Sequence, residues 1–254
     1  MHHHYIDRFA YRDSPVHRLD ARAKILAVMA YSTVLISLPR YAVPSPWYLV
    51  FLFLLLVCGG VPLGFVAKHT LLVSPFIVCV VIFAPLLDDT PVRISQTMTI
   101  GGGWLTAGSL LIRFVLGMAA LIALASTTRF PELLKALEKL GVPRPLVMQL
   151  RFLYRYLFVL MDQAMHMRLA RLARDAGRGP RRWAWQAGAG QIGALFVRTL
   201  EQAERTHLAM VARGYDGTIH LSKPLRWRGR DWAFLAAVAG YLILVRWGVA
   251  WSAS

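Results

Sequence analysis

Five apolar runs constrain the fold of this chain most, because about 20 consecutive apolar residues can cross a bilayer as a helix. The composition agrees, since 57% of the residues are hydrophobic and only 17% are charged. A Gly-Gly-Val-Pro break that begins at Gly59 predicts that the second run is kinked or split. We predict an all-α fold, a polytopic membrane helix bundle of about five spans. The predicted spans are Lys24–Leu38, Pro46–Val66, His69–Leu87, Trp104–Thr127 and Trp232–Ala250.

The basic residues are concentrated on one side of these spans. The segment up to Lys24 holds five of them, whereas the loop after the third span carries Asp88, Asp89 and a single arginine. Since cytoplasmic flanks collect Lys and Arg, we predict a cytoplasmic N-terminus. The loop from Arg129 to Arg230 then lies on the same side, and it holds 19 basic against 7 acidic residues, most of the formal net charge of +16. The predicted segments are a cytoplasmic N-terminal segment at 1–23, four spans within 24–127, a cytoplasmic helical domain at 128–230 and a C-terminal span within 231–254.

Helix start and stop signals divide this long loop into three predicted helices. The first covers FPELLKALEKLG, with Glu132 in its first turn and Gly141 as its stop. The second runs from about 143 to 176, and the third runs from about 185 to 213, where Gly214 ends it. None of the three is apolar enough to span a bilayer.

An Ala-Arg pair stands in the last turn of both longer helices, within Ala173-Arg174-Asp175 and Ala212-Arg213-Gly214. A cation at a helix C-terminus followed by glycine is an ordinary capping feature worth about 0.3–1 kcal/mol. The second helix also carries a basic stripe, however, and like charges on one face repel unless a partner neutralises them. Three partners for the stripe stay open: an acidic protein groove, anionic membrane lipid and plain solvent. Nucleic acid is the weakest candidate, because no signature of a nucleic-acid-binding fold is present. The stripe comprises Arg168, Arg171, Arg174 and Arg178.

Motifs for catalysis are absent from the sequence. It has no GxxxxGK[ST] loop for nucleotide phosphates, no HExxH, no GxSxG and no Cys/His cluster with metal-ligand spacing. We expect no cofactor or metal in the chain itself, with Cys58 and Cys79 as small core residues. His2–His4 could gather a metal, but three histidines beside the initiator are more often a solvated tail. Arg113 lies near the middle of the fourth span, where an ionisable group is costly and marks a candidate functional residue. We favour a structural role, in which Arg113 pairs inside the bundle or reaches the acidic pair after the third span.

Five short stretches carry a more specific signal, because they follow one another along most of the chain. They are LDARAK from Leu19, FPELLKALEKLGVP from Phe130, RFLYRY from Arg151, ARDAG from Ala173 and MVARGYDG from Met210. Together they resemble the transmembrane T component of energy-coupling factor (ECF) importers, which use ATP-binding-cassette (ABC) ATPases. The resemblance is strongest to the cobalt/nickel (Q-type) branch, and the stretches stand in the family's order.

The resemblance implies a non-catalytic scaffold whose cytoplasmic coupling-helix domain rests on two ABC-type ATPase subunits. In that family an Ala-Arg-Gly motif at the end of each of two helices docks into an ATPase groove. Carried over, the docking residues are Ala173-Arg174-Asp175 and Ala212-Arg213-Gly214. Asp175 departs from the pattern, since glycine is usual there. The alternative register Ala170-Arg171-Leu172 would make Arg171 the docking residue.

The same resemblance places ATP and Mg in the partner subunits and substrate binding in a separate membrane protein, the S component. It also implies a location in the inner (cytoplasmic) membrane, and it is the only basis for expecting cobalt or nickel as the substrate. The residues leave two other classes open, namely a self-sufficient secondary transporter or channel and a membrane-bound enzyme. The first would need convergent polar groups at the midplane of the membrane, and the second would need a catalytic set that the sequence lacks.

The charge distribution gives a topology that labelling can test. With Arg182→Cys as the single cysteine, we expect no modification of intact cells by an impermeant thiol reagent, because the basic loop stays in the cytoplasm. The same variant should react once the cells are opened. Labelling of position 182 in intact cells would reverse the predicted orientation.

Overall fold

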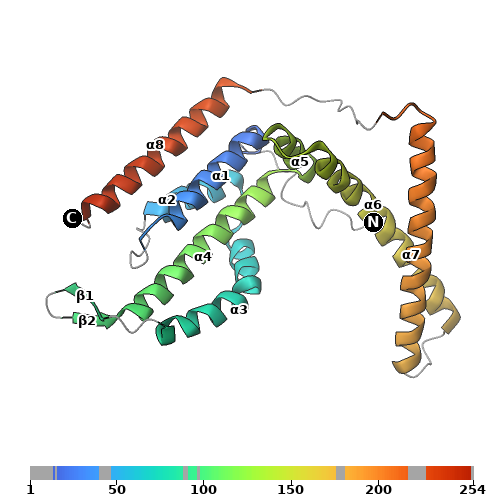
Figure 1. The fold of residues 1–254 in the computed structure, drawn as a ribbon, viewed down its shortest axis with the longest axis horizontal. Helices are drawn as coiled ribbons and strands as arrows, with labels where there is room; N and C mark the ends of the chain where they lie inside the picture. The colour runs from blue at the N-terminus through green and yellow to red at the C-terminus, as the bar shows by residue number, and fades with distance from the viewer. Residues whose placement is uncertain are drawn as a thin grey trace. The chain divides into compact units, whose positions relative to one another are not determined.

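The described part of the chain forms eight helices and one short β-hairpin, which divide into two compact units (Figure 1). The first unit comprises residues 1–140 and 225–254, and the second comprises residues 141–224. The second unit is therefore shorter than the predicted domain at 128–230, because the helix that follows Arg129 packs with the first unit. The computed structural model describes residues 14, 16–39, 47–87, 91–95, 98–175, 181–216 and 227–252.

The first unit is a helix bundle, which confirms the all-α prediction. One feature was not predicted, a pair of short antiparallel strands between the third and fourth helices, β1 (Pro91–Ser95) and β2 (Met98–Gly101). Six helices belong to this unit: α1 (Ala21–Ile36), α2 (Trp47–Gly59), α3 (Leu63–Leu87), α4 (Gly102–Thr127), α5 (Phe130–Lys139) and α8 (Gly229–Ser252).

The core of the bundle lies where α1 meets α4 and α8 and where α2 and α3 pack on α4. Tyr31 of α1 and Tyr48 of α2 are fully buried, and the Tyr31 hydroxyl donates to the Tyr48 carbonyl over 3.2 Å. On α4 the buried face is rich in alanine, including Ala119, Ala120 and Ala123. Small residues let helices approach closely, so this alanine face sets the close packing of α4 against its neighbours.

The predicted break at Gly59–Pro62 is present. It divides the predicted second span, so that the residues after the break belong to α3 and not to α2. Gly60 adopts a φ of +64°, which favours glycine, and Pro62 precedes the first residue of α3. The predicted start of the third span at His69 is wrong, because α3 is continuous from Leu63. Consequently α2 keeps only 13 residues, a length of about 20 Å, which is short for a bilayer core.

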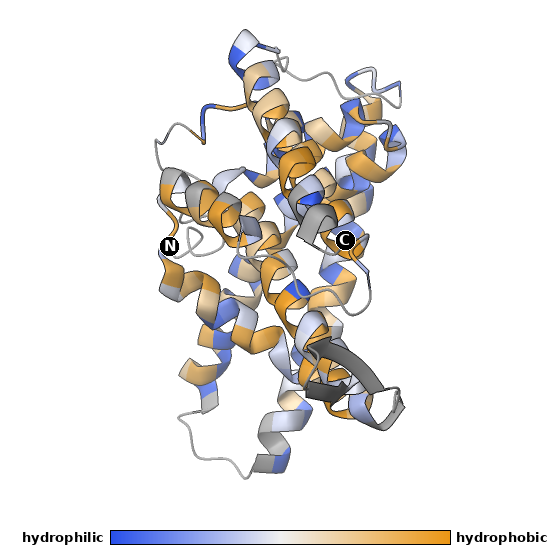
Figure 2. Cartoon of the chain, turned by 90° about the vertical axis from the view of Figure 1, so that its left-hand side faces the viewer, coloured by the Kyte–Doolittle hydropathy of each residue, from blue (hydrophilic) through white to orange (hydrophobic). Residues whose placement is uncertain are grey.

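Among the described residues, two of the predicted spans, α3 and α4, are long and apolar enough to cross a membrane. Figure 2, in which the ribbon is coloured by hydropathy, shows how hydrophobic residues are distributed along the helices. Only 11% of the apolar window of α3 is buried within the chain, so most of its apolar side chains are exposed. Cys79 on α3 is one of these exposed residues, so its assignment to the core is wrong. Pro75 lies inside α3, and Figure 1 shows that this helix bends, as a missing backbone donor requires.

The described part of the second unit holds two long helices, α6 (Arg144–Asp175) and α7 (Arg181–Val211). The end of α6 agrees with the prediction to within one residue, and α7 begins four residues earlier than predicted. Several residues used in the predictions lie outside the described part of the chain, namely His2–His4, Asp88, Asp89 and Arg178, together with the side chains of Cys58 and Asp175.

The turn between α2 and α3 gives a matched pair of glycine substitutions. A Cβ atom at Gly59 would lie 2.9 Å from Cγ2 of Thr127, whereas one at Gly64 would meet nothing within 4 Å. Gly59→Ala should lower the free energy of unfolding by about 1–3 kcal/mol, because the end of α4 must shift. Gly64→Ala should change it by at most about 1 kcal/mol. Equal melting temperatures for the two purified variants would contradict this packing.

Candidate functional site

The predicted docking residues lie on α6 and α7, which pair as an antiparallel hairpin. Near the start of α6, Met148 Sδ accepts a hydrogen bond from the Tyr215 hydroxyl at 3.0 Å. Further along, the Tyr156 hydroxyl donates to Thr206 Oγ1 at 3.1 Å. Toward the end of α6, Gln191 Nε2 donates to the Met167 carbonyl at 2.9 Å. The partner positions fall along α7 as they rise along α6, which defines the antiparallel register.

Because the helices are antiparallel, the two Ala-Arg pairs lie at opposite ends of the hairpin. Arg174 is in the last turn of α6, and both Ala173 and Arg174 are exposed. Asp175 is the last residue of α6. Arg213 follows the end of α7, and it is exposed together with Ala212 and Gly214.

The end of α7 has a defined capping geometry. Gly214 adopts a φ of +79°, its N–H donates to the Val211 carbonyl at 2.9 Å, and the Tyr215 N–H donates to the Met210 carbonyl at 3.0 Å. These two bonds form a Schellman motif, in which the residue with positive φ is almost always glycine. The prediction that Gly214 ends the helix is confirmed. Arg213 is the C-cap residue of this motif, so its backbone is fixed and its side chain projects from the helix end.

Arg171 and Arg174 are in different environments, although both belong to the basic stripe. Arg171 is half-buried, and its Nη1 lies 4.0 Å from the position that a Cβ atom would take at Gly188 of α7. Its guanidinium therefore packs across α7, whereas Arg174 is exposed. This difference favours Arg174 over Arg171 as the residue that can reach another protein.

A groove of about 650 Å³ runs between the two helices beside Arg174. Its walls include Arg171, Arg174 and His166 from α6 and Arg198 from α7. Arg198 was missed by sequence reasoning, because no local pattern connects it to the stripe on α6. The antiparallel pairing brings it there and makes this end of the hairpin a cationic surface.

Arg113 lies in the other unit, on α4, and contacts the backbone beyond the end of α1. Its Nη2 donates to the Pro39 carbonyl at 2.6 Å, and Arg246 Nη1 of α8 donates to the Ser37 carbonyl at 3.3 Å. Carbonyl groups at a helix C-terminus lack intrahelical partners and carry partial negative charge. Two guanidinium groups from different helices thus bind backbone carbonyls at the C-cap of α1 and in the segment just after it.

Comparison with known families identifies the chain. The profile of the CbiQ family, described as cobalt transport protein, matches residues 12–224, a range that includes Arg113, Arg174 and Arg213. The chain belongs to the CbiQ family of cobalt transport proteins. Its exposed apolar helices and this family together make it a membrane protein.

Three relatives show how far the similarity extends for this CbiQ-family chain. The energy-coupling factor transporter transmembrane protein EcfT of Lacticaseibacillus paracasei is 29% identical, over 95% of this chain and 98% of the relative. The cobalt transport protein CbiQ of Rhodobacter capsulatus is 34% identical over 39% of this chain and 40% of the relative. An uncharacterized protein of Methanocaldococcus jannaschii is 32% identical over 42% of this chain and 38% of the relative. The similarity to EcfT thus spans nearly both chains, whereas the other two matches span less than half.

The contact of Arg113 predicts a structural role in this CbiQ-family protein. Arg113→Ala should lower the free energy of unfolding by about 1.5–3 kcal/mol, because a charged hydrogen bond to the Pro39 carbonyl, just beyond α1, is lost. Leu121→Ala is the control, since Leu121 is an exposed residue on the same helix and should matter much less. Thermal unfolding in detergent measures both. An Arg113→Ala variant of normal stability that imports a different ion would argue for a substrate pathway instead.

Proposed function

We propose that this chain is the transmembrane component of an energy-coupling factor importer. It transmits the motion of two ABC-type ATPase subunits to a separate substrate-binding membrane subunit. One observation carries the proposal, the exposed arginine at each end of the helical hairpin, in a chain similar to EcfT along nearly its whole length. The chain itself has no catalytic role in this proposal, and ATP and Mg²⁺ bind to the ATPase subunits.

The chemistry of Arg213 suits docking into an acidic groove. A guanidinium is always charged and presents a planar fork of donors, so it can hold a carboxylate through two hydrogen bonds. The Schellman motif fixes the backbone of Arg213, and the small Ala212 and Gly214 beside it leave room for close approach. Arg174 offers the same chemistry at the other end of the hairpin. Two anchors at opposite ends of the hairpin would let two ATPases that close on ATP apply force to it.

The surface of the hairpin also supports a role inside a complex. Large apolar side chains are exposed along both helices, including Leu153 (61%) and Leu169 (57%) on α6 and Phe196 (63%) and Leu208 (67%) on α7. Two helices alone cannot enclose a core, and apolar patches of this kind mark surfaces that other molecules cover. The ATPases and the substrate-binding subunit are the partners that the proposal supplies.

The proposed substrate is a cobalt or nickel ion, which the partner membrane subunit binds. The family description and the name of the Rhodobacter relative support cobalt, whereas the EcfT name specifies no substrate. The proposed location is the inner (cytoplasmic) membrane, with the N-terminus and the α6–α7 hairpin on the cytoplasmic side. The excess of basic residues in the loop supports that orientation.

Substitution of the anchor arginines tests the proposal. Arg213→Ala should weaken ATPase binding, because loss of one partner of an interfacial charge pair costs about 2–5 kcal/mol. Arg213→Lys should restore binding only in part, since lysine cannot form the paired hydrogen bonds. Combined Arg174→Ala and Arg213→Ala should abolish transport while the chain still inserts. Co-purification of the ATPases, with uptake of Co²⁺ into cells, measures these effects.

Arg205→Ala is the matched control, because Arg205 is an exposed arginine in the interior of α7, where it pairs with Glu201. It should leave ATPase binding unchanged. If Arg213 acts only as a helix cap, its loss should cost about 0.3–1 kcal/mol of stability without affecting assembly. Normal ATPase yield and normal Co²⁺ uptake in the double variant would rule the anchor role out.

A further inference from the structure

The chain enters and leaves the hairpin unit at two points, and both connections start from one place in the bundle. On the entering side, α5 ends just before Gly141, and Ala136 of α5 packs against Ala21 and Ile25 of α1. On the returning side, the chain continues into α8 of the first unit. The start of α8 is bonded to the residue that precedes α1, as described next.

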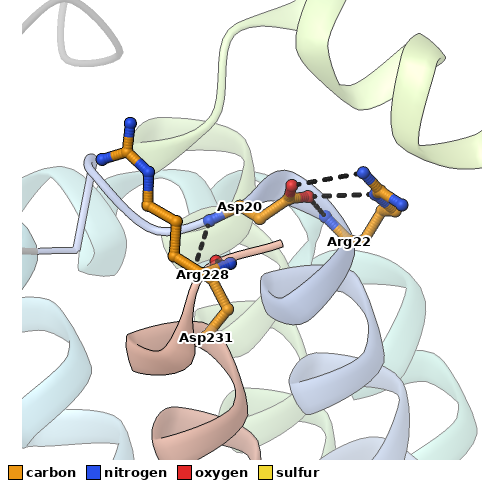
Figure 3. A network of polar contacts seen from close by, with 4 residues as sticks. All are labelled: Asp20, Arg22, Arg228 and Asp231. Atoms are coloured by element: carbon orange, nitrogen blue, oxygen red, sulfur yellow. Dashed lines mark hydrogen bonds and ion pairs between the residues drawn. The ribbon is translucent and has the colours of Figure 1, made fainter. Parts of the chain in front are cut away.

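A buried carboxylate joins the N-termini of α1 and α8 (Figure 3). Asp231 is only 1% exposed. Its Oδ1 accepts the backbone N–H of Asp20 at 3.0 Å, and its Oδ2 accepts that of Arg228 at 2.9 Å. Asp20 in turn caps α1 by accepting the N–H of Arg22 at 2.9 Å. Each carboxylate thus lies at the positive end of a helix dipole and bonds its otherwise unpaired donors.

Basic and aromatic side chains surround this pair of carboxylates. Arg22 Nε lies 3.3 Å from Asp20 Oδ1, and the Arg22 guanidinium lies 5.3 Å from the centre of the Trp227 ring. Trp227 stacks on Trp232 of α8 with ring centres 5.1 Å apart. Arg230 also donates to the Arg18 carbonyl. The start of α8 is therefore held against the start of α1 by several independent contacts.

A second buried charge links the same segment to α4. Lys24, in the first turn of α1, is 4% exposed, and its Nζ donates to the carbonyl of Thr127 at 2.8 Å. Thr127 is the last residue of α4, so the ammonium group satisfies a helix C-terminus that has no intrahelical partner. Residues 20–25, here called the junction segment, thus contact α4, α5 and α8.

We propose that the junction segment is the element through which motion of the hairpin reaches the membrane bundle. This inference rests on the proposed function and adds a place where force is transferred. Both covalent links of the hairpin start from helices that contact this segment. The bonds of Asp231 and Lys24 pass a displacement on to α1 and α4. Directed bonds to backbone groups fix position and orientation together, which apolar contacts alone do not. Asp20, Lys24 and Asp231 act as positioning residues.

A pair of substitutions at Asp20 isolates the central hydrogen bond. Asp20→Ala removes the carboxylate that caps α1 but keeps the N–H that Asp231 accepts. Asp20→Pro removes the N–H as well, and the φ of Asp20, −62°, is a value that proline adopts. Asp231→Asn is a third variant. The NH₂ group of the asparagine side chain must face the N–H of either Asp20 or Arg228, so one of the two hydrogen bonds of Asp231 is lost.

The readout is the amount of radiolabelled Co²⁺ taken up per ATP hydrolysed, measured for the complete complex in proteoliposomes. We expect this ratio to fall about tenfold in Asp20→Pro relative to Asp20→Ala, the size of effect that one hydrogen bond to a charged group gives. Asp231→Asn should lie close to Asp20→Pro. ATPase co-purification and the rate of ATP hydrolysis should stay near wild type, because the docking arginines are untouched. A purely structural role would instead lower the yield of complex and leave the ratio unchanged.

The outcomes separate this inference from the function on which it rests. Equal uptake per ATP in all three variants and the wild type would overturn the junction and leave the proposed function standing. Failure of Asp20→Pro and Asp231→Asn to insert would show that the bonds serve stability alone, and would also overturn it. A wild-type chain that recovers no ATPases and drives no Co²⁺ uptake would remove the proposed function and this inference together.

Discussion

The relative positions of α1, α4 and α8 depend on how their backbone ends are satisfied. A helix leaves four N–H and four C=O groups unpaired at its ends, and an apolar environment offers them no water. Side chains from neighbouring helices replace the water: Asp231 at the starts of α1 and α8, Lys24 at the end of α4, and Arg113 and Arg246 beyond the end of α1. All of these bonds except the one between Arg228 and Asp231 join two different elements, so they satisfy backbone groups and also hold the elements of the bundle together.

Charged residues have different uses in the two units. In the bundle, Lys24 and Asp231 are buried and their charged groups bind backbone groups of the same chain. In the hairpin, Arg174 and Arg213 are exposed at helix ends, where their charges are presented to other molecules. The charged residues that add up to the formal net charge of +16 therefore do not all have the same role. Burial decides whether a basic residue holds the fold together or is available to a partner.

The hairpin and the bundle also differ in what stabilises them. The bundle has an apolar core that includes Tyr31, Leu35 and Leu116. Among the described residues the hairpin is held together by the contact between α6 and α7, with large apolar residues such as Leu153 and Leu208 exposed. A partner that binds the folded hairpin adds stability in proportion to its concentration and affinity. The isolated chain is thus expected to be less stable in this unit than the assembled complex.

The sequence by itself determined the helical class and the ends of several helices. Gly141 and Gly214 have positive φ angles and stand where the stop signals placed them, because a left-handed residue at a helix end is a local requirement that glycine meets. The start of α3 was misplaced, since Gly60 and Pro62 mark a break without showing which neighbouring run is continuous. Only the tertiary structure brought together Asp20 and Asp231, which are 211 positions apart. Their pairing follows from the packing of whole helices, and local preferences along the chain carry no information about it.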